Sequence, residues 1–392
     1  MHRALLGVFS LAIAGCLTAC DDEEPKANSP GPTAPAKIAE GFPALRVTTV
    51  VGRLDHPWDV KPIGRGRFLV TERDRARLSL VDNGKRHTIA FPGRKVWVSG
   101  ETGLLGMAVD PDFQKNHRVY TCQGGFLANG GHDVRVNAWR LDVGDRKVTK
   151  IKTLLGHFPT SSGRHGGCRL LITKNGALLV GTGDAAIGTN ARDRTSYGGK
   201  TLRLDRFTGR PWPKNRWADA SNKTRRYIHT WGHRNVQGLT QRSDGTLWSV
   251  EHGPDRDDEV NLLRNGADYG WNPVPGYNES VPMTDRSLPG PQVPARWKSG
   301  FPTLATSGAD WLPTARHSGW GSYRGTLAVA ALKASRVLFM KFDKTGHLRW
   351  VKVPAALTRY GRLRAVTTLP NGDVLVTTDN GGGQDKILRV RP

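Results

Sequence analysis

Residues 170–181 read LLITKNGALLVG and contain the pattern that decides the fold. Two apolar runs, Leu170–Thr173 and Ala177–Gly181, flank the tripeptide Lys174-Asn175-Gly176. Asn-Gly between two β-prone runs is a strong signal for a tight hairpin, because both residues accept the left-handed backbone that such turns need. This stretch therefore predicts two antiparallel strands joined by a short turn.

The same pattern returns at Leu239–Ser249 around Asp244-Gly245 and at Val366–Thr377 around Asn371-Gly372. We expect a fourth strand to follow each hairpin. The six segments that fit this position are Leu78–Asp82, Val134–Leu141, Lys200–Asp205, Glu259–Leu263, Val337–Phe342 and Lys386–Val390.

The repeats make about six units of roughly 45 to 60 residues, which favours a β-propeller because single four-stranded blades must stack around an axis to bury both faces. Arg46–Arg53 is expected to supply the strand that closes the ring. A β-sandwich is the alternative, but the regular repeat argues against it. The predicted fold class is all-β, with four-stranded antiparallel blades.

Residues 1–20 predict an export signal. Arg3 gives a positive start, residues 4–17 are apolar, and Leu17-Thr18-Ala19-Cys20 has the pattern of a lipoprotein signal. The apolar run is short for a membrane-spanning helix. Cys20 is the expected lipidation site and Cys16 a second candidate, while a plain cleaved signal is the alternative.

Residues 21–42 predict a flexible tether, since Asp21–Lys37 is rich in Pro, Ala and charge and has little to bury. Residues 43–392 are then the propeller domain. We expect an exported protein that is lipid-anchored on the outer face of the cytoplasmic membrane or elsewhere in the periplasm or cell envelope.

The chain has a formal net charge of +24. Its basic residues are scattered, and an exported protein rarely meets DNA, so we expect no nucleic-acid partner. Attraction to an anionic envelope surface is one use of this charge, and a solvated surface without a specific partner is another. Cys122 and Cys168 can pair in such a compartment or remain two buried thiols.

Residues 227–272 concentrate groups that bind anions and metals. Arg234 and Asn235 precede Gln237-Gly238, and Glu251-His252-Gly253-Pro254 leads into an acidic cluster. Carboxylates and backbone carbonyls suit Ca²⁺, and a planar Arg suits a carboxylate or quinone oxygen. A solvated acidic turn is the alternative interpretation. The cluster consists of Asp255, Asp257, Asp258 and Glu259.

This segment resembles the soluble, pyrroloquinoline quinone (PQQ)-dependent glucose and aldose sugar dehydrogenases, for which GxRNxQG and E(H/Q)GPxxxDE are signatures. The resemblance continues in order from about His56 to the C-terminus. It runs through the motifs HPWDV, GLLGMAVDP, GRHGGCRLLI, GTGDA, GGKTLRLD, AALK and GRLRAV. It implies a six-bladed propeller with its site on the axis.

His165 lies in Gly163-Arg164-His165-Gly166-Gly167, before the first hairpin strand. A histidine near its free pKa suits the removal of a proton from a sugar hydroxyl. The resemblance implies that His165 is the general base, while the anomeric hydrogen leaves as hydride to the quinone. Arg234 would neutralise the reduced oxygen, and Asn235 would fix the ring.

The resemblance also implies the ligands of a catalytic calcium ion. These are the backbone carbonyls of Gly253 and Pro254, with Asp258 nearby through water. Calcium would act as a Lewis acid on the quinone carbonyl. Glu259 and the backbone of Tyr269 match a second, structural calcium site.

Cationic side chains are implied for the carboxylates of PQQ. Lys333 and the alternating pair Arg362 and Arg364 match the positions that bind them. Residues two apart in a strand share a face, so both arginines can reach one ligand.

Three further residues are expected near the sugar. Asp184 matches an aspartate that orients the substrate or the histidine, and Glu101 stands where glucose enzymes have Gln. Trp297 either borders the sugar and cofactor or belongs to the core.

The leading hypothesis is a PQQ- and calcium-dependent aldose dehydrogenase that oxidises the anomeric carbon to a lactone. Blades 3 to 5 lack the long insertions expected of dimeric glucose enzymes, which favours the aldose branch and a monomer. No GxGxxG opens a helix and no CxxCH binds haem, so electrons would pass to an external quinone or redox protein. The alternatives are a calcium-dependent sugar lactonase and a non-catalytic propeller that binds glycans or a protein.

Overall fold

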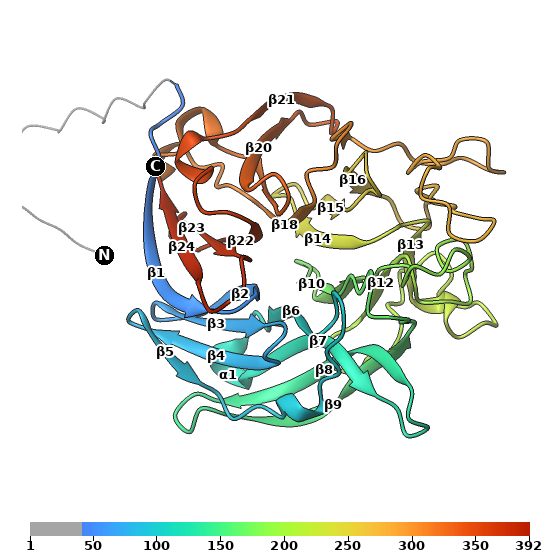
Figure 1. Cartoon of the computed structure of the whole chain (residues 1–392), viewed down its shortest axis with the longest axis horizontal. Coiled ribbons are helices and arrows are strands. Elements are labelled where there is room, and N and C mark those ends of the chain that lie inside the picture. The colour runs from blue at the N-terminus through green and yellow to red at the C-terminus, as the bar shows by residue number, and fades with distance from the viewer. Residues whose placement is uncertain (1–40) are drawn as a thin grey trace, which may run out of the picture. The chain divides into compact units, whose positions relative to one another are not determined.

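The computed structural model describes residues 41–392, so the predicted signal, both lipidation candidates and most of the predicted tether lie outside the described residues. The described chain is nearly all β and forms six four-stranded antiparallel sheets around a common axis (Figure 1). The prediction of a six-bladed β-propeller is confirmed.

Blades 1 to 3 follow one another along the chain. Their strands are β2 (Pro57–Gly64), β3 (Arg67–Glu72), β4 (Arg77–Asp82) and β5 (Lys85–Thr88); β6 (Leu104–Val109), β7 (Arg118–Phe126), β8 (His132–Asp142) and β9 (Lys147–Phe158); and β10 (Arg169–Ile172), β11 (Ala177–Gly181), β12 (Lys200–Asp205) and β13 (Ile228–Trp231).

Blades 4 to 6 complete the ring. Their strands are β14 (Val236–Gln241), β15 (Leu247–Glu251), β16 (Glu259–Leu263) and β17 (Trp297–Lys298); β18 (Thr306–Trp311), β19 (Leu327–Ala331), β20 (Arg336–Phe342) and β21 (Leu348–Lys352); and β22 (Leu363–Thr368), β23 (Val374–Thr378), β24 (Asp385–Arg391) and β1 (Arg46–Leu54). Helical turns are short: α1 (Phe113–Asn116) and the 3₁₀ turns Gly93–Lys95, Arg225–Tyr227, Arg316–Ser318, Gly321–Tyr323 and Ala355–Leu357.

The N-terminal strand closes the ring, as predicted. β1 pairs antiparallel with β24, beginning at Arg46 opposite Arg391, so the sixth blade contains strands from both ends of the described chain. Closure in this way leaves only the short outer edge of each blade unpaired.

The hairpin predicted at residues 170–181 is also confirmed. β10 and β11 pair with Leu170 opposite Val180, and the Gly176 amide donates to the Thr173 carbonyl in the turn. Gly176 has a φ of 88°, which an L-residue rarely adopts.

The assignment of the fourth strands was wrong. The six predicted segments correspond to β4, β8, β12, β16, β20 and β24, which are the third strands of their blades. Fourth strands lie at the outer edge and bury less apolar surface, so their hydrophobic pattern is weaker. In β5, for example, the residues Lys85–Thr88 include none that is fully buried.

The first strands of the blades line the axis, and several carry β-bulges near their N-terminal ends. Register shifts occur in β6 between Leu104 and Met107 and in β18 between Thr306 and Ala309, with similar shifts in β2, β14 and β22. Bulges redirect side chains at a rim. Glycine permits the close approach of neighbouring blades there: a Cβ on Gly106 would lie 2.1 Å from the Cys168 carbonyl oxygen.

Hydrophobic clusters fill the spaces between blades. One of them contains Cys122 and Cys168, which form a disulfide with a Cα–Cα separation of 5.5 Å. The bond joins β7 to the loop before β10, and both cysteines have no exposed surface. Of the two alternatives for these cysteines, the structure shows the paired one.

Two connections are longer than expected. Residues 206–227 join β12 to β13, and residues 264–296 join β16 to β17. The second of these reaches the axial site described below. Within residues 41–392, no helix is both long and apolar enough to cross a membrane.

Candidate active site

The predicted site residues gather at one end of the axis. Each blade begins with a hairpin, so the start of the first strand and the end of the second strand lie at the same end of the propeller. His165 precedes β10, Arg234 and Asn235 precede β14, and Asp184 follows β11. Segments far apart in the sequence therefore place their side chains around one axial position.

His165 is held by a carboxylate. Its Nδ1 lies 2.8 Å from Oδ1 of Asp184 and 3.0 Å from the Tyr277 hydroxyl. Asp184 also accepts hydrogen bonds from Tyr277 Oη and Trp271 Nε1, both at 2.7 Å. A carboxylate acceptor places the proton of a neutral imidazole on Nδ1, which leaves Nε2 as the proton-accepting atom.

The backbone around this pair is unusual. His165, Cys168, Ala185 and Ala186 all have φ between 53° and 76°, in the left-handed region that non-glycine residues rarely adopt. Such conformations typically cluster at functional sites, where the surrounding structure holds them. Gly183 is required where the two segments meet, because a Cβ there would lie 1.8 Å from the His165 carbonyl oxygen.

Arg234 is buried beside His165 and points its guanidinium toward a carboxylate that the sequence did not suggest. Its Nη2 pairs with Glu279, and its Nη1 donates to the His252 carbonyl at 3.2 Å. Its Nε is buried without a hydrogen-bond partner. Glu279 also accepts two bonds from Arg164 Nη2, at 2.7 and 2.8 Å.

Glu279 therefore neutralises two arginines next to the histidine. Burial opposes its ionisation, but Arg164 and Arg234 hold the pKa of Glu279 below its usual value. Burial and the neighbouring Asp184 raise the pKa of Tyr277, so its hydroxyl stays protonated at neutral pH. Both residues come from the 264–296 connection.

Asn235 and Glu101 link three blades. The Glu101 carboxylate accepts from the His165 backbone amide at 3.0 Å and from Asn235 Nδ2 at 3.4 Å. Asn235 Oδ1 accepts from the Gly167 amide and from Gln237 Nε2. The predicted site residues Asn235 and Glu101 thus also fix the loop that carries His165.

Arg364 lies deeper on the axis. Its Nη2 pairs with Asp379 at 2.6 Å, and its Nη1 donates to Gln237 Oε1 at 3.1 Å. Burial works against ionisation of Asp379, yet Arg364, His56 and Arg73 hold the pKa of Asp379 far below its usual range. A second buried arginine, Arg169, lies nearby with its Nη2 unpartnered.

The other two predicted cationic residues are exposed. Lys333 lies in the turn between β19 and β20, and Arg362 immediately precedes β22. The Arg362 side chain is exposed in part, and the partial burial of its guanidinium lowers the pKa of Arg362. Asp379 and Arg364 are among the charges around it, so Arg362 lies beside the Arg364–Asp379 pair. No ion pair to Lys333 or Arg362 forms within the described part of the chain.

His252 is a neutral neighbour of this group. Burial, followed by the positive charges of Arg364 and Arg234, holds the pKa of His252 well below its usual value. Its Nε2 is buried without a partner. It therefore offers an uncharged polar atom to a bound molecule.

The predicted calcium turn has free backbone carbonyls. Among the described residues, no hydrogen bond reaches the carbonyl oxygens of Gly253 or Pro254. The Asp258 carboxylate accepts from the backbone amides of Gly253 at 3.0 Å and Leu304 at 2.7 Å, so it holds the turn in shape. No group of three or more His, Cys, Asp or Glu side chains within residues 41–392 is placed to bind a metal.

Glu259 and Tyr269, the residues predicted for a second calcium ion, are both buried. Burial and the nearby Glu251 raise the pKa of Glu259 to about 7, and its carboxylate contacts Lys298 Nζ at 3.2 Å. Tyr269 is fully buried and stacks on His233, which in turn bonds Glu251. These contacts make the pair part of the wall that supports Arg234.

Trp297 is not part of the axial group. It lies in β17, the outermost strand of blade 4, and packs against the hydrophobic cluster of blades 4 and 5. It is partly buried there, a placement that matches the core alternative left open by the sequence.

Sequence reasoning missed several residues of the site. Tyr277 and Glu279 lie in a connection without periodic pattern, and Asp379 follows a strand in an ordinary turn sequence. Only the Gly and Pro content of residues 270–276 signalled a built loop. The fold brings these residues to the axis from distant segments of the chain, and no local sequence pattern encodes that. The full missed set is His56, Arg169, Gln237, Trp271, Tyr277, Glu279 and Asp379.

The unpartnered donors of the site suit an anionic molecule with several oxygen atoms. Unpartnered buried donors are present on Arg169 and Arg234, and exposed cations are present on Lys333 and Arg362. Buried polar atoms without partners are rare in folded proteins and call for an additional group. Carboxylates and quinone oxygens are the acceptors that such donors satisfy.

Comparison with known proteins gives a consistent result. The profile of the glucose/sorbosone dehydrogenase family matches residues 54–389. Aldose sugar dehydrogenase YliI of Escherichia coli is 30% identical, with 89% of this chain and 93% of that protein covered. Quinoprotein glucose dehydrogenase B of Acinetobacter calcoaceticus is 27% identical, with 73% and 75% covered. The PQQ-bound structure of aldose sugar dehydrogenase from Streptomyces coelicolor superposes with a TM-score of 0.72 at 27% identity, covering 90% and 99%.

Proposed function

Because the chain belongs to the glucose/sorbosone dehydrogenase family, we propose that it oxidises aldoses at the anomeric carbon to lactones, with PQQ as electron acceptor and calcium as a second cofactor. The observation that carries this proposal is the His165–Asp184 pair, which lies beside Arg234 and in which Nε2 of His165 is free. A relative with bound PQQ and the same fold supports the choice of cofactor.

His165 removes the proton in the proposed reaction. Nε2 takes the proton of the anomeric hydroxyl, the C–O bond becomes a carbonyl, and the anomeric hydrogen departs with its electron pair. Asp184 stabilises the imidazolium through Nδ1, at the 2.8 Å separation seen here. Glu101 positions the His165 backbone through its amide.

PQQ supplies the two-electron acceptor for that hydride. The residues that would hold it are Arg234 and Asn235 at the quinone end, with Lys333, Arg362 and Arg364 for its carboxylates. The free carbonyls of Gly253 and Pro254 would hold calcium, an oxygen-ligand cation that acts as a Lewis acid. Glu259 and the Tyr269 backbone are proposed for a second, structural calcium ion.

Electrons then leave to an external quinone or redox protein. We propose that the enzyme works in the periplasm or cell envelope as a lipid-anchored monomer, with Cys20 as the preferred lipidation site and Cys16 as the alternative. The sequence of residues 1–42 supports this placement.

Reconstitution tests the proposed function. Protein purified from a host that makes no PQQ is expected to oxidise aldoses, in a dye-linked assay, only after PQQ and calcium are both added. The pair is also expected to raise the melting temperature, because ligands that bind the folded state stabilise it. Hydrolysis of lactones with calcium alone would indicate a lactonase, and indifference of both readouts to PQQ would reject the dehydrogenase proposal.

A further inference from the structure

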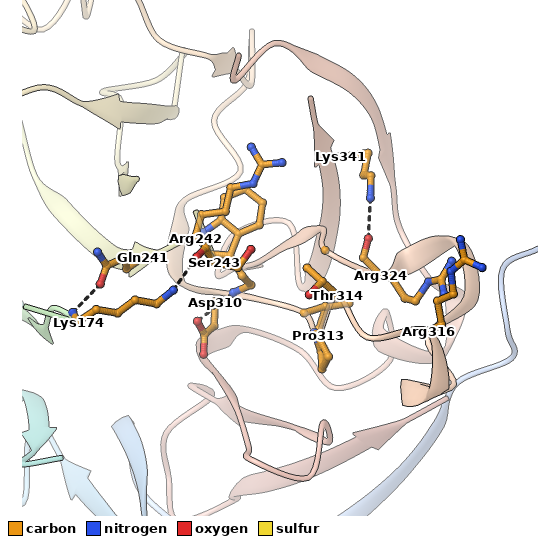
Figure 2. Close-up of a pocket in the computed structure, with 13 residues that line it drawn as sticks. Lys174, Gln241, Arg242, Ser243, Asp310, Pro313, Thr314, Arg316, Arg324 and Lys341 are labelled. Atoms are coloured by element: carbon orange, nitrogen blue, oxygen red, sulfur yellow. Dashed lines mark hydrogen bonds between the residues drawn. The ribbon is translucent and has the colours of Figure 1, made fainter. Parts of the chain in front are cut away.

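A basic cavity lies at the other end of blades 3 to 5, away from His165 (Figure 2). It has a volume of about 490 Å³, which is within the usual range for small-molecule sites of roughly 300–1,000 Å³. It is bordered by the β10–β11 and β14–β15 turns, which lie opposite the strand ends that form the active site. The charged residues that line it are Lys174, Arg242, Arg316, Arg324, Lys341 and Asp310.

Backbone carbonyls fix three of the five cations in place. Lys174 Nζ donates to the Ser243 carbonyl at 2.7 Å, Lys341 Nζ donates to the Arg324 carbonyl at 2.6 Å, and Arg242 Nη1 donates to the Asp343 carbonyl at 2.7 Å. Carbonyl oxygens orient these groups without cancelling their charge. The wall is therefore rigid and positive.

The acids nearby do little to neutralise it. The Asp310 carboxylate accepts from the Thr240 hydroxyl at 2.9 Å and from the Thr368 amide at 2.8 Å, and it forms no ion pair with any of the five cations. The one ion pair that the five cations form with described residues is Arg242 with Asp244, at 3.7 Å. An excess of positive charge remains over the cavity.

Arg316 and Arg324 form no hydrogen bond or ion pair through their guanidinium groups to other described residues, and Nη1 of Arg324 is buried without a partner. Both side chains line the same cavity, and Figure 2 labels them. Burial, together with Arg242 and Arg324, lowers the pKa of Lys341, as expected where cations are crowded. Two unpaired arginines that line one cavity suit an oxyanion with several acceptor oxygens.

The chain enters the domain next to this cavity. The Gly41 carbonyl accepts from the Ser322 amide at 2.8 Å, and the Phe42 ring packs on Tyr323 with centroids 4.8 Å apart. Arg324 follows directly. A lipid-bearing tether, predicted for the residues before this point, would bring the cavity close to a membrane surface.

We propose that this cavity binds the phosphate group of a phosphate ester, as carried by an anionic phospholipid headgroup. The negative surface of a membrane attracts basic residues by roughly 1 kcal/mol each. The same chemistry would bind a free phosphate. The experiment separates the two sources.

The test uses the full chain with Cys16→Ser and Cys20→Ser, so that no attached lipid contributes to binding. Flotation with phosphatidylcholine vesicles, with and without phosphatidylglycerol, measures membrane binding, and calorimetry with inorganic phosphate measures the free anion. Arg316→Gln/Arg324→Gln is compared with Lys85→Gln/Lys115→Gln, which removes the same charge from exposed positions on blades 1 and 2. Equal melting temperatures check that both variants fold.

The arginine variant is expected to bind phosphatidylglycerol vesicles about 25-fold more weakly, from two residues near the surface. The lysine variant is expected to lose much less, because Lys85 and Lys115 do not line the cavity. Arginine-dependent binding of inorganic phosphate without vesicle binding would keep the phosphate site and assign it to a free ligand. An equal loss of vesicle binding in the arginine and lysine variants would overturn the proposal. So would the absence of binding both to phosphatidylglycerol vesicles and to inorganic phosphate.

Discussion

At the scale of single residues, the proposed chemistry depends on which atom of His165 is free. Nδ1 of His165 is hydrogen-bonded to Asp184 and Tyr277, whereas Nε2 has no partner among the described residues. A histidine held in this way needs no conformational change before it accepts a proton.

His165→Ala is expected to lower the turnover of aldose oxidation by about 100- to 10,000-fold, the usual range for loss of a positioned base. PQQ affinity should stay close to that of the wild type. Dye-linked kinetics and a PQQ titration measure the two effects, with exposed His317→Ala as control. Full activity in the His165 variant would remove this residue from the mechanism.

A second prediction concerns Glu279. Its carboxylate pairs with the guanidinium groups of Arg164 and Arg234, which an anionic cofactor would otherwise bind. Glu279→Gln removes the carboxylate that neutralises Arg234 and Arg164, so PQQ should bind roughly 3- to 10-fold more tightly, a fraction of the energy of one charge-assisted hydrogen bond. Quenching of tryptophan fluorescence during PQQ titration gives the affinity.

The matched control for this variant is Asp145→Asn, an exposed acid in the β8–β9 turn. Its affinity should equal that of the wild type. If Glu279→Gln instead weakened binding, Glu279 would act as a support for Arg234 and not as a competitor of the ligand.

At the scale of elements, the loop that carries His165 is tied to blade 2 by the disulfide. Cys168 follows His165 by three residues, and its partner Cys122 lies in β7, 46 positions away in sequence. Cross-linking a loop of this length lowers the conformational entropy of the unfolded chain and so stabilises the folded state.

Cys122→Ala/Cys168→Ala is expected to lower the free energy of unfolding by about 2–4 kcal/mol. Urea unfolding followed by tryptophan fluorescence measures the change. A reducing agent should bring the wild type toward the variant's midpoint while leaving the variant itself unchanged. A wild type insensitive to reductant would show that the bond contributes no stability.

At the scale of the whole molecule, buried neutral histidines make stability depend on pH. Burial, with the neighbouring charges of Arg203 and His233, lowers the pKa of His229 to about 3. The unfolded chain has a histidine pKa near 6.5. Between these values the unfolded state binds more protons, so stability is present above pH 6.5 and falls as the pH decreases.

His229 alone should therefore lower the free energy of unfolding by about 2 kcal/mol between pH 7 and pH 5. Urea titrations at several pH values are expected to show a shallower decline for His229→Asn than for the wild type. His347→Asn, an exposed position, is the control and should keep the wild-type slope. Identical slopes in all three proteins would contradict a neutral buried His229.

The sequence alone determined the local structure and the fold class. Asn175-Gly176 and Asp244-Gly245 specify tight turns through backbone conformations that few other residues accept, and apolar runs on both sides specify strands. Repetition of this unit required a closed ring, since a single blade leaves apolar faces uncovered. The resemblance of the motifs placed His165, Asp184, Arg234 and Asn235 in one site, and the structure brings these four together.

Only the tertiary structure decided what surrounds them. Tyr277 and Glu279 of the β16–β17 connection contact His165 and Arg234, whereas Trp297 lies in β17, an outer strand. The pairing of Cys122 with Cys168 likewise depends on a distance between blades. The same holds for the cavity that brings Lys174 and Arg242 together with Arg316. Local sequence patterns report short-range backbone preferences and burial, whereas these contacts depend on how distant segments are brought together in the ring.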